Sequence, residues 1–182
     1  MKYVILGLKL VILSYFAYLL YFLATGYNPA SYPYNPPFLI FVIDMINLFI
    51  HEAGHFFFKI FGRWVYFLGG SLFQVLLPLA LVITTWRSNK ASIFFPLFWV
   101  GESMINVSIY IQDAPYRKLH LIAKGLIHDW NWLLSDNLEL AEPLGLAVYY
   151  SGLLLCLAGL IAGVVFAIIS YQNYSDEIQI TT

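Results

Sequence analysis

Two histidines and a glutamate lie within five consecutive residues of this chain, His51-Glu52-Ala53-Gly54-His55. On a helix, His51 and His55 share one face because they are four residues apart, so both imidazoles can bind one metal ion. Glu52 is rotated by about 100° from His51, which places it beside the ion, where it can take a proton from an attacking water. This is the chemistry of the H-E-x-x-H motif of zinc hydrolases. The sequence therefore predicts a zinc site with Glu52 as its general base.

The motif belongs to a strongly apolar chain. Of the 182 residues, 61% are hydrophobic and 10% are charged, whereas soluble domains carry about 25% charged residues. A run of about 20 apolar residues crosses the hydrocarbon core of a membrane. The chain has five such runs, at about residues 3–24, 37–61, 65–86, 92–113 and 144–170. We therefore predict an all-α integral membrane protein with five transmembrane helices, embedded in the lipid bilayer as a single domain over residues 1–182.

Charged residues in the loops predict the orientation. With a cytoplasmic N-terminus, six lysines and arginines fall inside and two outside, which follows the positive-inside rule. The inner set is Lys2, Lys59, Arg63, Arg117, Lys118 and Lys124, and the outer set is Arg87 and Lys90. This orientation places the C-terminus outside and the His/Glu motif near the cytoplasmic side. Residues 116–127 mix basic and apolar side chains and are predicted to form an amphipathic segment on the cytoplasmic membrane surface.

Charge and cysteine content exclude several classes of function. The formal net charge is −1 and no basic tract is present, which argues against a nucleic-acid partner. A single cysteine, Cys156, cannot form an internal disulfide. Only His120 and His128 remain outside the motif, too few for a histidine-rich membrane di-iron enzyme. A long first apolar run with a poor cleavage pattern favours a retained span over a signal peptide.

A third metal ligand must come from elsewhere, because catalytic zinc takes three protein ligands and one water. The candidates are Asp113, Glu102, His128 and Asp129. Asp113 ends the fourth predicted span at a depth similar to that of His55, whereas Glu102 lies roughly 16 Å further out at 1.5 Å per residue. Depth therefore favours Asp113. His128 and Asp129 open an inner-loop segment that can fold back as a further ligand or a substrate-binding group, although His128 also suits a polar surface.

Other polar residues lie inside the predicted spans. Asp44 and Glu102 fall at the same depth, so they can form a pair with one carboxyl protonated, in a structural or a proton-handling role. Asn106 lies two turns before Asp113, where it can bind a substrate backbone, stabilise an oxyanion or bond to another helix. Gln74 follows paired glycines and can line a cavity, because irregular backbone at membrane depth is tolerated only there or inside protein.

These motifs resemble those of the site-2 protease family of intramembrane zinc metalloproteases. The H-E-x-x-H segment resembles the first motif of that family. Asn106 followed by Asp113 resembles its second, in which a later membrane helix carries an asparagine and an aspartate zinc ligand. The resemblance implies a compact, divergent zinc metalloprotease. It implies that His51, His55 and Asp113 hold zinc, that Glu52 is the general base, and that a membrane protein or peptide is cleaved in or near the bilayer.

Two other classes of function could use the same residues. A metal transporter or sensor would bind the ion without hydrolysis, with Asp44, Glu102 and the histidines along an ion path. An assembly or chaperone component would use the polar residues only to hold helices together. Ionisable groups at the centre of a spanning helix cost about 2.5–3.5 kcal/mol each. Three such groups within one turn need compensation, which a bound divalent ion would supply, and this favours a metal site.

Overall fold

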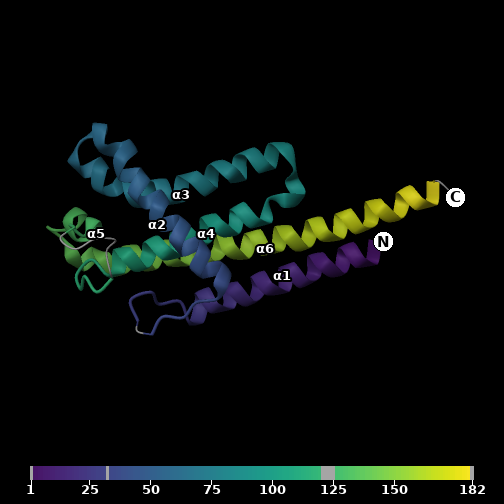
Figure 1. Ribbon diagram of the computed structural model, residues 1–182, viewed down its shortest axis with the longest axis horizontal. Helices are drawn as coiled ribbons and strands as arrows, with labels where there is room; N and C mark the ends of the chain where they lie inside the picture. Colours follow the sequence, from purple (N-terminus) through teal and green to yellow (C-terminus); the bar gives the residue numbers. More distant parts are fainter. Residues whose placement is uncertain (1, 32, 120–125, 181–182) are drawn as a thin grey trace.

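A computed structural model of the chain describes residues 2–31, 33–119 and 126–180, and every regular element among them is a helix. Four shorter helices connect five long ones (Figure 1). The long helices are α1 (Lys2–Thr25), α2 (Phe38–Phe58), α3 (Arg63–Ser88), α4 (Phe94–Gln112) and α6 (Ala141–Ile180). The short helices are η1 (Lys59–Phe61), η2 (Lys90–Ser92), α5 (Asp129–Leu133) and η3 (Leu138–Leu140).

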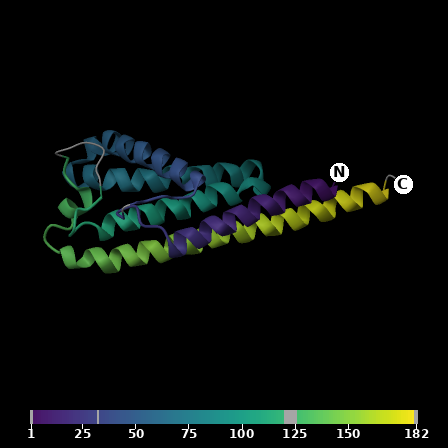
Figure 2. The same cartoon turned by 60° about the horizontal axis from the view of Figure 1, so that its bottom comes forward.

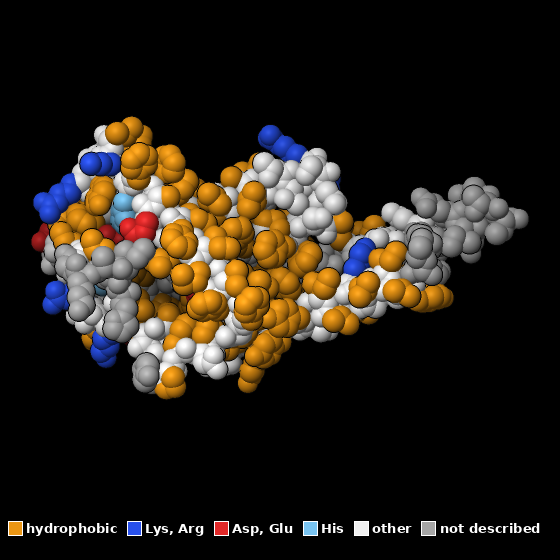
Figure 3. Space-filling model, in the orientation of Figure 1, with side chains coloured by type: hydrophobic (Ala, Val, Ile, Leu, Met, Phe, Trp, Pro, Cys, Tyr) orange, Lys and Arg blue, Asp and Glu red, His pale blue; other side chains and the backbone are white. Residues whose placement is uncertain are grey.

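All five long helices are long and apolar enough to cross a membrane, which confirms the five predicted helical runs. The candidate spans are Tyr3–Thr25, Phe38–Phe61, Arg63–Ser88, Lys90–Gln112 and Leu138–Asn173. Apolar side chains cover much of the outer surface (Figure 3). Such a surface suits a lipid environment, because the hydrocarbon core holds no water for polar groups. The described lysines and arginines gather mainly at the end of the bundle that carries α5 (Figure 3).

Close helix packing organises the bundle into two layers. Helix α4 lies against α6, where a Cβ on Gly152 would come within 2.6 Å of the carbonyl oxygen of Gly101. Helix α1 runs beside α6, and the two continue together past the turn between α3 and α4 (Figures 1 and 2). The buried core between α1, α4 and α6 includes Phe16 and Phe98, whose rings meet edge to face at 4.9 Å. These three helices form the layer that supports α2 and α3.

Helices α2 and α3 form the second layer, in contact through glycines. A Cβ on Gly54 would overlap the carbonyl oxygen of Gly69, so the two backbones touch. One residue further on, a Cβ on Gly70 would lie 2.5 Å from Nε2 of His51. The paired glycines of α3 therefore bring the helices together and leave room for an imidazole between them.

A short helix, α5, is fixed on α3 by its tryptophans. The indole nitrogen of Trp130 donates a hydrogen bond of 2.9 Å to the hydroxyl of Ser71. Trp132 stacks on Phe67 with ring centroids 4.4 Å apart, and the guanidinium of Arg63 lies 5.0 Å from the Trp132 ring centroid. These contacts hold α5 beside the start of α3 and at the end of α4.

The predicted amphipathic segment over residues 116–127 is only partly described. Residues 120–125, including His120 and Lys124, lie outside the described residues. The described parts, 116–119 and 126–127, are turn or irregular chain instead of helix. The local reason is a tight reversal after α4. Asp113 accepts hydrogen bonds from the backbone N–H groups of Lys118 and Leu119, both at 2.9 Å, and Arg117 has a φ of 52°.

Candidate metal centre

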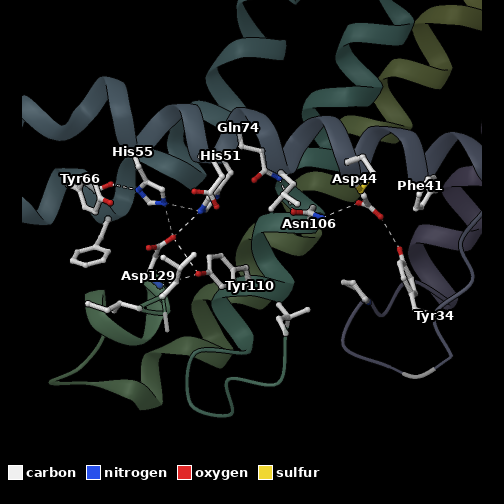
Figure 4. Close-up of a pocket in the computed structure, with 18 residues that line it drawn as sticks. Tyr34, Phe41, Asp44, His51, His55, Tyr66, Gln74, Asn106, Tyr110 and Asp129 are labelled. Atoms are coloured by element: carbon white, nitrogen blue, oxygen red, sulfur yellow. Dashed lines mark hydrogen bonds and ion pairs between the residues drawn. The ribbon is translucent and has the colours of Figure 1, made fainter. Parts of the chain in front are cut away.

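The two histidines of the H-E-x-x-H motif meet on one face of α2, as their spacing predicts. His51 and His55 lie with their Nε2 atoms 3.2 Å apart and their ring centroids 4.9 Å apart (Figure 4). The Nδ1 atom of His55 lies 2.8 Å from the carbonyl oxygen of Tyr66. That oxygen can only accept, so Nδ1 of His55 carries a proton, and Nε2 can bind a metal ion when it is deprotonated.

Asp129, the first residue of α5, completes a group of three possible metal ligands. Its Oδ2 atom lies 2.9 Å from Nε2 of His51 and 3.2 Å from Nε2 of His55. The three ligand atoms lie within 4.8 Å of one another, and His51, His55 and Asp129 could hold a metal ion. All three side chains point toward one another from two elements far apart in the sequence (Figure 4).

The spacing of these ligand atoms fits a small divalent cation. Zinc bonds to nitrogen and oxygen of about 2.0–2.1 Å place the ligands of a tetrahedral site roughly 3.3 Å apart. The observed separations are 2.9, 3.2 and 3.2 Å. Two imidazole nitrogens and a carboxylate oxygen are also ligand types that zinc accepts, and a metal cation or protons on the imidazoles would balance the charge of the carboxylate. The group could therefore hold a small divalent cation.

Asp129 is ionised and firmly positioned. Burial alone would raise the pKa of its carboxyl, but the hydrogen bonds and charges of His51 and His55 outweigh it and hold that pKa below its usual range. The hydroxyl of Tyr110 accepts a 3.1 Å hydrogen bond from the backbone N–H of Asp129 and lies 3.4 Å from its Oδ2. Tyr110 thus holds both the backbone and the carboxylate of this residue.

Tyr110 is a site residue that sequence reasoning missed. Its ring centroid lies 5.6 Å from that of His51 and 4.2 Å from that of His128, so it packs between α2 and the segment before α5. The available signal was its position one helical turn before Asp113, on the face of α4 that points to the site. A tyrosine in an aromatic-rich membrane helix carries little information alone.

The sequence favoured Asp113 as the third ligand, with His128 as a further one, and the structure places both outside the group of three. The carboxylate of Asp113 accepts the backbone N–H groups of Lys118 and Leu119, and its Oδ2 lies 3.3 Å from Nε2 of His128. Burial lowers the pKa of His128 despite this carboxylate, so the ring is neutral. Its Nδ1 accepts the N–H of Asn131 at 3.2 Å. Asp113 and His128 therefore build the turn that delivers Asp129.

A cavity of about 590 Å³ opens beside the three ligands. Glu52 lines this cavity, as do His51, His55, Tyr110 and Asp129. Glu52 is half-buried and belongs to the same helical turn as the two histidines. Its carboxyl therefore shares a water-accessible space with the candidate ligands, as a general base would require.

The opposite end of the cavity carries a second polar group, centred on Asp44. Its Oδ1 accepts hydrogen bonds from Tyr27 at 2.7 Å and Asn106 at 3.0 Å, and its Oδ2 accepts one from Tyr34 at 3.0 Å. The amide of Gln74 donates to Oδ1 of Asn106 at 2.8 Å (Figure 4). Burial chiefly, together with the charge of Asp44, raises the pKa of both tyrosines, so they remain hydroxyl donors.

Asn106 and Gln74 therefore make inter-helix hydrogen bonds in this second group. Glu102 lies behind Asp44, fully buried between α2 and α4. Its Oε2 accepts a 2.8 Å hydrogen bond from the amide of Asn47. The Oδ1 atom of Asn47 in turn accepts from the indole of Trp99 at 2.9 Å. We name Asp44, Glu102 and the side chains bonded to them the carboxyl pair network.

Apart from Asp113 and His128, which build the turn before Asp129, the predicted site residues thus divide between two centres at the two ends of one cavity. His51, His55 and Asp129 form the candidate metal centre, with Glu52 on the cavity wall. Comparison of the chain with family models, curated proteins and solved structures found no match in any of the three.

Proposed function

We propose that this chain is a multi-pass intramembrane metallohydrolase, of the zinc metallopeptidase type that its motifs resemble. The observation that carries the proposal is the convergence of His51, His55 and Asp129 on one point, with ligand atoms within 4.8 Å. Glu52 lines the cavity beside that point. Three protein ligands with an open side toward a cavity are what catalytic zinc sites provide.

The residues of the site would divide the work of hydrolysis. Bound zinc would polarise the scissile carbonyl and lower the pKa of the attacking water. Glu52 accepts the proton of that water and delivers it to the leaving amine. The carbonyl of Tyr66 orients His55, and Tyr110 orients Asp129, so the ligands keep their geometry during turnover.

The cavity favours a short apolar stretch of chain as substrate. Apolar side chains form much of its wall, among them Phe41, Met45, Leu48, Leu126 and Ile127. A volume of about 590 Å³ lies in the range of sites for drug-sized ligands. A whole transmembrane helix does not fit such a space. A substrate segment would therefore enter unwound, which also exposes the carbonyls that a helix engages in its own hydrogen bonds.

The basic residues support a cytoplasmic placement of the metal centre. The segments at the α5 end are η1, the start of α3 and the turn after α4 (Figure 1), and they carry Lys59, Arg63, Arg117 and Lys118. The turn at the far end of α3 carries Arg87 and Lys90. By the positive-inside rule, the α5 end faces the cytoplasm. Both termini lie at the opposite end from α5 (Figure 1). Cysteines introduced at Lys59 and Arg87 would show which end of the bundle faces the cytoplasm by their reaction with a membrane-impermeant maleimide. The native Cys156 is buried and should not react.

With the α5 end in the cytoplasm, both termini lie on the outer side, whereas the loop charges predicted a cytoplasmic N-terminus. An odd number of spans would place the two termini on opposite sides, yet α1 and α6 run side by side with both termini at one end. Both α1 and α2 run toward the α5 end, and α2 begins close to the level along the bundle at which α1 ends (Figures 1 and 2). The basic residues near the candidate metal centre are the basis for placing it on the cytoplasmic side, and the maleimide measurement tests this placement.

Replacement of the general base tests the hydrolase proposal directly. Purified wild type should cleave a panel of fluorogenic transmembrane peptides in liposomes, lose that activity with a chelator, and regain it with Zn²⁺. Glu52→Gln should lower the rate by about 10²–10⁴-fold, with unchanged zinc content by elemental analysis. Glu139→Gln, which alters an exposed carboxyl, is the matched control. A normal cleavage rate in the Glu52→Gln protein would exclude the assigned role.

A metal transporter is the second candidate, because the cavity joins the metal centre to Asp44 at membrane depth. In that case zinc should enter sealed vesicles that contain the protein, and Asp44→Asn should abolish uptake. Uptake that persists in Glu52→Gln, without peptide cleavage by wild type, would favour transport over hydrolysis.

A further inference from the structure

Two carboxyl groups meet inside the bundle, away from the candidate metal ligands. Asn106 of α4 donates a 3.0 Å hydrogen bond to Asp44 of α2, and Asn47 of α2 donates a 2.8 Å hydrogen bond to Glu102 of α4. On each helix the carboxyl and the amide lie about one turn apart, so these crossed hydrogen bonds make Asp44 and Glu102 neighbours across the α2–α4 interface. Glu102 has no exposed surface. Among the described residues, neither carboxyl forms an ion pair with a lysine, arginine or histidine. Two neighbouring negative charges that are buried without a cation repel each other strongly, so the pair favours a state in which one carboxyl is protonated.

The hydrogen bonds around Asp44 identify it as the ionised partner. An ionised carboxylate accepts about four hydrogen bonds. Asp44 accepts three from neutral donors: Tyr27 and Asn106 at Oδ1, and Tyr34 at Oδ2. One acceptor position, on Oδ2, therefore remains open. All the assigned partners of Asp44 donate, which is the environment of a carboxylate.

The surroundings of Glu102 are those of a protonated acid. Its Oε2 accepts from the amide of Asn47, whose orientation is fixed because its Oδ1 accepts from the indole N–H of Trp99. Its Oε1 is fully buried and has no donor among the described residues. A bare carboxylate oxygen left in this state is unfavourable. A proton on Oε1 removes the deficit, because the resulting O–H can donate to Asp44.

We propose that Asp44 and Glu102 bind one proton between them, carried by Glu102 at Oε1 and donated to Asp44. The pair then has a single negative charge and every acceptor has a donor. Asp44 lines the cavity, whereas Glu102 lies behind it. The proton therefore exchanges with the cavity only through Asp44. This proton-binding site goes beyond the proposed hydrolase function and does not depend on it.

A metal cation is a poorer occupant of this site. The hydroxyls of Tyr27 and Tyr34 and the amides of Asn47 and Asn106 all direct hydrogens at the two carboxyls. A cation placed there would face the positive ends of these groups. Among the described residues, another titratable group near Glu102 is the buried thiol of Cys156 on α6, which donates to the carbonyl oxygen of Phe98 at 3.4 Å.

Infrared spectroscopy of the full chain tests this proposal. A protonated carboxylic acid gives a C=O stretching band that is separate from carboxylate bands and shifts in D₂O. The wild-type protein should show a buried acid band that disappears in Glu102→Gln. The glutamine amide replaces the O–H as a donor to Asp44, so this variant should fold and keep its zinc content. The exposed control Glu139→Gln should leave the band unchanged.

A second variant determines which carboxyl carries the proton. In Asp44→Asn, Glu102 stays protonated but loses its carboxylate acceptor, so the band should persist at a shifted frequency. Loss of the band in Asp44→Asn with persistence in Glu102→Gln would assign the proton to Asp44 and overturn the proposal. Identical spectra for wild type and Glu102→Gln would overturn it as well. Neither outcome bears on peptide cleavage, so the metal centre is tested separately.

Discussion

The candidate metal centre and the carboxyl pair network lie in one cavity and share α2, yet they differ in their balance of donors and acceptors. The metal centre gathers three acceptor atoms, from His51, His55 and Asp129. In the network, neutral groups donate hydrogen bonds to both carboxylate oxygens of Asp44. Only Oε1 of Glu102 has no hydrogen-bond partner among the described residues. Buried polar content alone therefore does not distinguish a candidate metal site. The balance between hydrogen-bond donors and acceptors does distinguish these two regions.

The two regions also differ in the elements that complete them. The network is built mainly between long helices, with Asp44 and Asn47 on α2 facing Glu102 and Asn106 on α4. The metal centre depends on a five-residue helix held by side-chain contacts. A change in the network should therefore reduce stability, whereas a change in the metal centre should reduce metal binding. The following predictions test that distinction.

The largest effect is expected from removal of a histidine. His55→Ala deletes one of two imidazole ligands, and the remaining two ligands do not make a closed site. We expect the zinc content of the purified protein to fall from about one ion per chain to background. Elemental analysis beside Glu102→Gln, which should keep its zinc, separates ligand loss from general damage. Equal zinc in the His55→Ala and wild-type proteins would contradict the metal centre.

A paired substitution distinguishes the third ligand of the structure from that favoured by the sequence. Asp129→Ala should weaken zinc binding by more than about 100-fold, beyond the 10–100-fold typical of supporting groups. Asp113→Ala should weaken it by only about tenfold, because Asp113 shapes the turn and does not touch the other ligands. Competition with a chromogenic chelator measures both affinities. A larger loss of zinc affinity in Asp113→Ala than in Asp129→Ala would instead support Asp113 as the third ligand, as the sequence predicted.

A smaller effect should follow the loss of the Tyr110 hydroxyl. Tyr110→Phe keeps the ring packing on His51 and His128 but removes the contacts with the N–H and the carboxylate of Asp129. We expect zinc affinity to fall by about tenfold, together with a change in the visible spectrum of the Co²⁺-substituted protein. The exposed Tyr116→Phe is the control. An unaltered Co²⁺ spectrum would mean that Tyr110 does not position Asp129.

The smallest effect on metal binding is expected in the network. Asn47→Ala removes the donor to Glu102 and the acceptor of Trp99. Leaving these groups unsatisfied should lower the stability of the folded protein by about 1–3 kcal/mol, with zinc affinity unchanged. Thermal unfolding in detergent, compared with the exposed Asn137→Ala, measures this cost. A matching loss of zinc would show that the two centres are coupled.

Local sequence patterns predicted the helices and the first two candidate ligands. Apolar runs located all five long helices, because length and hydropathy are local properties. Spacing within one helix placed His51 beside His55 for the same reason. Counting residues along two spans put Asp44 and Glu102 at one depth, and the structure makes them neighbours across the α2–α4 interface.

The third ligand could not be predicted in the same way, because it depends on tertiary contacts. Asp113 lay at a suitable depth, but its carboxylate is occupied by a chain reversal that no spacing rule reveals. Asp129 reaches the histidines because Trp130 and Trp132 attach α5 to α3. The segment His-Asp-Trp-Asn-Trp contains an acid followed by two tryptophans that can pack on a helix. Which helix they pack on is determined by tertiary contacts and could not be predicted from the sequence.

The long sequence separation within the metal centre has a consequence for biogenesis. His51 and Asp129 are 78 positions apart, and α3, α4 and the following turn lie between them. A nascent chain with only its first three helices in the bilayer offers two imidazoles and no carboxylate to complete the centre. Zinc capture should therefore occur late in synthesis, after the fourth helix has been inserted and α5 has docked. If the chain has the proposed hydrolase activity, the nascent protein would until then be unable to cleave neighbouring proteins in the insertion machinery.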